Sequence, residues 1–156
     1  MNNVKHVVWD WNGTLLDDID VSMDALNTIL KKAQLPLVLD KGEYRKYFQF
    51  PVIEYYKKVG FDFEKTPFPM LAKEYMRYYQ PHSMACSLHD GVTDMLSQLK
   101  KKGVHQYLLS PVICISFMSS WIIMILNNIL SRYAVWIISM RHPRQSWQSA
   151  LYRKAV

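Results

Sequence analysis

Acidic residues are missing from the last part of the chain. The last Asp or Glu is Asp94, and residues 95–156 carry eight Lys or Arg and no carboxylate, whereas residues 1–94 carry 11 basic and 13 acidic residues. The net charge of +6 does not indicate a nucleic-acid-binding protein, because these basic residues form no patch interleaved with base-stacking aromatics. So long a stretch without a carboxylate is unusual for a soluble domain, and it marks a change in composition.

Cysteine is also scarce. Cys86 and Cys114 are the two cysteines of the sequence, too few and too far apart for a disulfide framework, a metal-binding pattern or a redox pair. The opening residues, "MNNVKHVVWDW", do not form a signal peptide, because their apolar run is short and is interrupted by Asp10. We therefore expect a cytoplasmic protein with reduced thiols.

The segment "VVWDWNGTLLDD", residues 7–18, predicts a buried strand that ends in Asp10 and then turns at Asn12 and Gly13. A second short apolar run, "HQYLLS", ends on Ser110. Helical periodicity and capping residues between the two strands predict helices near residues 20–33, 50–60, 66–81 and 90–103, and a short helix that starts at the capping box of residues 40–43. This order of elements predicts a parallel sheet, in which ligands bind at the carboxyl ends of the strands.

The stretch "DWNGTLLDD" resembles the first motif, Asp-x-Asp-Gly-Thr-Leu, of the haloacid dehalogenase superfamily, most of whose members are magnesium-dependent phosphatases. The stretch "LHDGVTDMLSQLKKKGVHQYLLS" resembles the return into that family's core, and residues 4–110 look most like phosphoglycolate-phosphatase-like members. The resemblance implies an α/β fold with an incomplete Rossmann-like parallel sheet. Residues 1–17 and 86–110 would form this core, and residues 18–85 an inserted all-helical cap.

The resemblance also assigns roles. Asp10 would be the nucleophile that forms an aspartyl phosphate, and it would bind Mg²⁺ together with the main-chain carbonyl of Asn12. Phosphate would be bound by Trp11, Gly13, Thr14 and Ser110. The substrate would be a small phosphorylated metabolite, contacted in the cap by Arg45 and Gln49.

Asn12 departs from the family's pattern. It stands where the family has a second Asp, which protonates the leaving group and later activates water. An amide has no proton to give at neutral pH. The site would then favour a good leaving group, take an acid from the cap, or be slow.

Two later parts of the family's site are not found in the sequence: a lysine that bridges nucleophile and phosphate, and an acidic motif that completes the magnesium site. Residues 111–156 contain no Asp or Glu, and Lys154 has no family context. We therefore expect little turnover.

The alternative is a non-catalytic, truncated product that associates with a membrane through residues 112–130, which are uncharged. Two asparagines and several serines interrupt that run and make a span less favourable.

The genetic code offers another explanation for the tail. Consider a shifted reading frame in which each codon consists of the last base of one codon of the present frame and the first two bases of the next. In that frame, Trp136 followed by Ile137 can encode only Asp. Over residues 134–144 the shifted frame permits Gly-Leu-Asp-Asn-Ile-Tyr-Ala-Thr-Ser-Lys. This string resembles the family segment that carries the missing lysine. We therefore expect that residues 111–156 are a frameshifted tail. The sequence makes no prediction of the oligomeric state.

Overall fold

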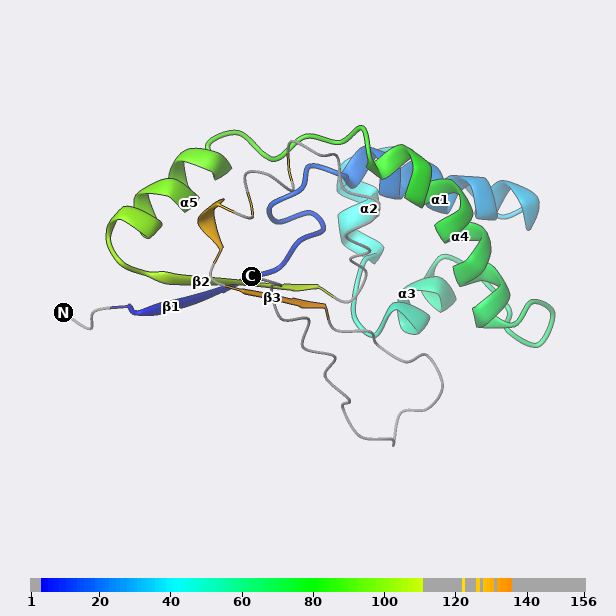
Figure 1. Ribbon diagram of the computed structural model, residues 1–156. Coiled ribbons are helices and arrows are strands. Elements are labelled where there is room, and N and C mark those ends of the chain that lie inside the picture. The colour runs from blue at the N-terminus through cyan, green and yellow to red at the C-terminus, as the bar shows by residue number, and fades with distance from the viewer. Residues whose placement is uncertain (1–3, 111–121, 123–125, 127, 131, 136–156) are drawn as a thin grey trace. The chain divides into compact units, whose positions relative to one another are not determined.

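The computed structural model describes residues 4–110, 122, 126, 128–130 and 132–135. The chain divides into two compact units, one built on a sheet and the other helical (Figure 1). Unit 1 combines Met1–Asp18 with Met84–Val156, and unit 2 is Ile19–Ser83.

Unit 1 is built on a parallel sheet of the order β1-β2-β3, formed by His6–Trp9, His105–Ser110 and Arg132–Val135. Trp9 lies opposite Leu108, and Ser110 lies opposite Val135. The β-branched and aromatic residues of β1 suit the pleated conformation. The predicted α/β class with a parallel sheet is therefore confirmed.

Helix α5, Val92–Lys101, packs beside this sheet (Figure 1). Its Leu96 side chain is fully buried in the unit 1 core together with Leu108 of β2. The buried Gln106 amide connects three elements, because its Nε2 donates to the Leu96 carbonyl at 2.8 Å and its Oε1 accepts from Trp9 Nε1 at 3.2 Å. Both ends of this buried amide are therefore satisfied, as burial of a polar group requires.

Three residues from the acid-free part of the chain belong to the same core. Ile122, Leu126 and Leu130 recur every four residues and are each at most 5% exposed. They pack with Trp11, Leu15 and Leu16 in one apolar cluster. Most of residues 111–156, including most of the candidate span 112–130, lies outside the described residues. Within the part that is described, no helix is long and apolar enough to cross a membrane.

Unit 2 is helical. The predicted helices are confirmed as α1 Ile19–Lys32, α2 Lys41–Tyr47, α3 Val52–Lys58 and α4 Phe68–Ser83. Asp40 caps α2 as predicted, because its Oδ1 accepts from the Glu43 amide at 2.8 Å. Leu26, Ile29 and Leu30 form one apolar face of α1, and they pack in a core with tyrosines of α2 and α3.

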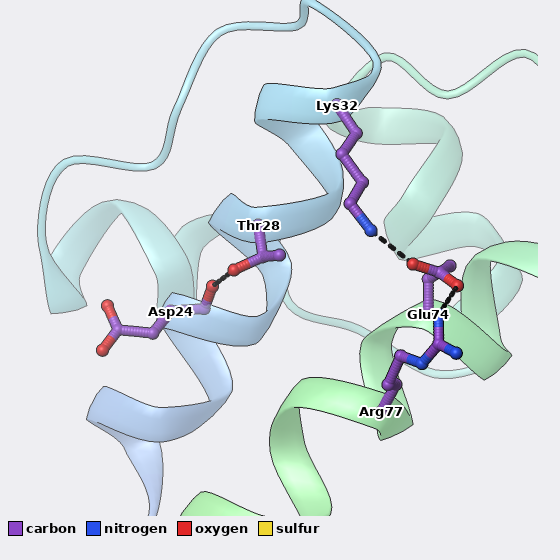
Figure 2. A network of polar contacts seen from close by, with 5 residues as sticks. All are labelled: Asp24, Thr28, Lys32, Glu74 and Arg77. Carbon is purple, nitrogen blue, oxygen red and sulfur yellow. Dashed lines mark hydrogen bonds and ion pairs between the residues drawn. The ribbon is translucent and has the colours of Figure 1, made fainter.

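Charged side chains join α1 to α4 on the surface of unit 2. Lys32 of α1 forms an ion pair with Glu74 of α4, and Arg77 approaches the same carboxylate at 3.3 Å (Figure 2). The hydrogen bond from Lys32 lowers the pKa of Glu74 below its usual value. Because these groups are in contact with solvent, the apolar core and not this network supplies most of the stability of unit 2.

Candidate active site

The turn that follows β1 is anchored by its apolar residues. The amides of Thr14, Leu15 and Leu16 all donate to the Trp11 carbonyl, at 3.2, 3.0 and 3.0 Å. The side chains of Trp11, Leu15 and Leu16 are buried in the unit 1 core. Asp10, directly after β1, is exposed. The buried residues of the turn therefore hold the backbone that presents the Asp10 carboxylate to solvent.

Segment 87–89 holds the far side of this turn. The Asp17 amide donates to the Ser87 carbonyl at 2.9 Å, and the His89 amide donates to the Leu15 carbonyl at 3.0 Å. The side chains of His89 and Asp17 approach to 3.8 Å. Residues 15–17 are thus tied to the chain where it returns to unit 1, which restricts the turn from both ends.

Thr14 is the nearest described polar partner of Asp10. Its Oγ1 donates to Asp10 Oδ2 at 3.3 Å. A hydroxyl both donates and accepts, so Thr14 can orient the carboxylate while its oxygen lone pairs accept from another group. The structure therefore brings together Asp10 and Thr14, two residues that the sequence assigned to the site.

Gly13 has a conformational role. Its φ of +68° lies in the left-handed region, where glycine meets no steric penalty. Its amide donates to Asp18 Oδ1 at 2.7 Å and to the Leu16 carbonyl at 3.1 Å. The amides of Gly13 and Thr14 are therefore directed to acceptors within the turn. The Trp11 side chain lies in the core, so a phosphate could meet only the main chain of this residue.

Asp18 is not among the site residues that the sequence predicts. Its side chain is buried, and its Oδ2 accepts from Asn12 Nδ2 at 2.9 Å. Together with the bond from Gly13, this gives both carboxylate oxygens a donor from the turn. The sequence signal for this role is an acid six residues after Asn12. Helix propensity and capping rules instead assign that acid to the helix that follows.

The sheet brings the ends of β1 and β2 to the same edge. The two strands are parallel, and Trp9 lies opposite Leu108. Asp10 follows Trp9 directly, and Ser110 is the last residue of β2. This position is where open parallel sheets bind ligands. The contact between Asp10 and Ser110 stays a prediction.

Comparison with protein families decides the relationship. The family model described as haloacid dehalogenase-like hydrolase matches residues 7–111, which is more than half of the chain. The chain belongs to this family. A comparison with curated proteins finds no match.

Solved structures, among them two whose descriptions name a phosphatase, share the fold of this haloacid dehalogenase-like chain. A predicted phosphatase from Clostridium acetobutylicum has a TM-score of 0.63 at 21% identity, covering 85% of this chain and 61% of that protein. A putative phosphoglycolate phosphatase from Lactobacillus plantarum has a TM-score of 0.68 at 15% identity, covering 85% and 62%. CbbY from Rhodobacter sphaeroides in complex with phosphate has a TM-score of 0.54 at 16% identity, covering 85% and 64%. The chain thus spans less than two thirds of each of these proteins.

The remaining predicted site residues lie in unit 2 of this haloacid dehalogenase-like chain. Arg45 is exposed on α2, and Gln49 Oε1 accepts a hydrogen bond from Lys58. Their role in substrate binding stays a prediction. Among the described residues, no cluster of three or more His, Cys, Asp or Glu is arranged to hold a metal ion. Membership of the family nevertheless generally implies dependence on Mg²⁺.

Proposed function

We propose that this chain derives from a magnesium-dependent phosphatase that cleaves a small phosphate ester through an aspartyl phosphate on Asp10. The observation that supports it most directly is the exposed Asp10 carboxylate at the carboxyl end of a parallel strand, 3.3 Å from the Thr14 hydroxyl. The substrate class is a small phosphorylated metabolite, in line with the phosphate complex of CbbY and the phosphoglycolate phosphatases among the similar structures. Unit 2 would be the cap, and the protein would be cytoplasmic.

The proposed reaction has two displacements. An oxygen of Asp10 attacks phosphorus, the bond from phosphorus to the ester oxygen breaks, and the leaving alcohol takes a proton from solvent, because the Asn12 amide has none to give. Water then cleaves the aspartyl phosphate, which returns the carboxylate and releases inorganic phosphate. Thr14 would hold Asp10 in position for attack.

The described oxygens have the hard-ligand chemistry that Mg²⁺ prefers, and the Asp10 carboxylate and the Asn12 main-chain carbonyl would hold the ion. When bound, the ion would supply positive charge that screens the carboxylate from the phosphate. One carboxylate makes a weak site. No Asp or Glu follows Asp94 in the sequence to strengthen it.

The test compares two phosphate esters. Purified chain with MgCl₂ should release p-nitrophenolate from p-nitrophenyl phosphate slowly, and it should release less product from an alkyl phosphate, whose poorer leaving group needs the proton that Asn12 cannot donate. Asp10→Asn should abolish the release. The change Asp24→Asn, on the exposed face of α1, removes the same charge and should leave the release unchanged. Turnover that persists in Asp10→Asn would overturn the proposal. Robust turnover that requires Asp10 would instead show that the late motifs are dispensable.

A further inference from the structure

Asp18 is a buried carboxylate, whereas the other polar side chains of its turn are exposed or half-buried. It is 2% exposed, whereas Asp10, Gly13 and Thr14 in the same turn are exposed. Its Oδ1 accepts from the Gly13 amide at 2.7 Å, and its Oδ2 accepts from Asn12 Nδ2 at 2.9 Å. Both bonds connect it to residues that lie two and three positions after Asp10. A charged acceptor makes stronger hydrogen bonds than a neutral one.

These bonds select one orientation of the Asn12 amide. A carboxylate only accepts hydrogen bonds, so the NH₂ group of Asn12 must face Asp18. Rotating the amide by half a turn would set its oxygen against Oδ2, and two acceptors would then meet in a buried place. The Asp18 carboxylate therefore determines which end of the Asn12 amide faces inward. The same carboxylate accepts from the main-chain amide of Gly13, whose backbone is in the left-handed region.

We propose that Asp18 is a positioning residue, which fixes the Asn12 amide and the Gly13 turn beside Asp10. The proposal rests on the proposed function for its use in catalysis, but not for its geometry. It also accounts for the pairing of an amide at position 12 with an acid at position 18. Position 12 supplies a donor and position 18 the acceptor, so an ionised acid at position 18 requires a donor at position 12.

An exchange of the two side chains tests this pairing. Asn12→Asp places a carboxylate against a carboxylate and should lower the melting temperature by about 4–8 °C. Asp18→Asn should lower it less, because the Asn12 amide can rotate and accept from the new amide. In the double variant Asn12→Asp/Asp18→Asn, the new amide can accept from Gly13 with its oxygen and donate to the new carboxylate with its nitrogen. The double variant should therefore recover most of the loss. Additive losses in the double variant would overturn the proposal.

A spectroscopic measurement separates positioning from general stability. In ¹H–¹⁵N NMR spectra, Asp18→Asn should move the Gly13 amide signal and the Asn12 side-chain NH₂ signals. The change Asp24→Asn, at an exposed carboxylate of α1, should leave them in place. Unmoved signals in Asp18→Asn would overturn the proposal. Neither measurement depends on turnover, so a negative phosphatase assay would count against the proposed function and not against this pairing.

Discussion

Buried tyrosines of unit 2 have pKa values that are raised well above the ordinary value. Tyr55 and Tyr56 of α3 are buried in the core of unit 2. Burial raises the pKa of both hydroxyls well above the ordinary value of 10.0, and the nearby Tyr44 raises them further. The folded chain therefore keeps these groups neutral at a pH where the unfolded chain ionises them.

The first consequence is alkaline unfolding. Because the folded pKa is raised, the stability from these tyrosines is fully present below the unfolded value of about 10 and is lost as the pH rises above it. We expect phenolate absorbance and loss of helical circular dichroism to change together above that pH. Tyr55→Phe should move the transition to higher pH, whereas Tyr78→Phe, at a partly exposed position on α4, should not. Equal midpoints for both variants would contradict this account.

At the scale of elements, the acid-free stretch takes part in the fold of unit 1. Ile122, Leu126 and Leu130 are buried in its core, and Lys100 of α5 donates to the Asn128 carbonyl. β3 then pairs with β2 in parallel. Side chains that repeat every four residues lie on one face of a helix, and such a face can pack against the apolar face of a sheet.

Truncating a side chain in this stretch tests its contribution. Leu126→Ala removes a side chain that is 1% exposed, and it should destabilise unit 1 by about 2–5 kcal/mol. Asn128→Ala, two residues away at an exposed position, should change stability by less than about 0.5 kcal/mol. Urea unfolding followed by tryptophan fluorescence measures both. A negligible effect of Leu126→Ala would mean that the stretch is not part of the stable core.

At the scale of the whole molecule, the chain covers 61–64% of the similar proteins described above. The lysine and acidic motifs implied by the family resemblance would follow Ser110, and no Asp or Glu is present there. Loss of one group that stabilises charge on a transferring phosphoryl typically costs about 2.7–4 kcal/mol, or roughly 10²–10³ in rate. If both groups are missing, we expect turnover to be very slow.

Restoring the shifted reading frame after Ser110 tests the origin of the tail. We expect the restored chain to contain the lysine segment and, further on, an acidic pair after a strand. Its magnesium-dependent phosphatase activity should exceed that of the present chain by at least about 10²-fold, and its soluble yield should rise. Asp10→Ala in the restored chain is the blank. An immediate stop codon, or a restored frame without carboxylates, would contradict the frameshift and favour the membrane-associated tail.

The sequence by itself determined the local features. Periodicity and caps located the helices of unit 2, and the motif around Asp10 placed a carboxylate at the end of the first strand, because these signals act over a few residues. Only the tertiary structure decided the roles of Asp18 and Leu126. Asp18 precedes a helix, so capping rules alone cannot reveal that it accepts from Asn12 and Gly13. An uncharged segment with apolar residues at positions such as 122, 126 and 130 has the same sequence pattern in a membrane helix and in a helix buried in a protein core. Only the packing around these side chains distinguishes the two cases.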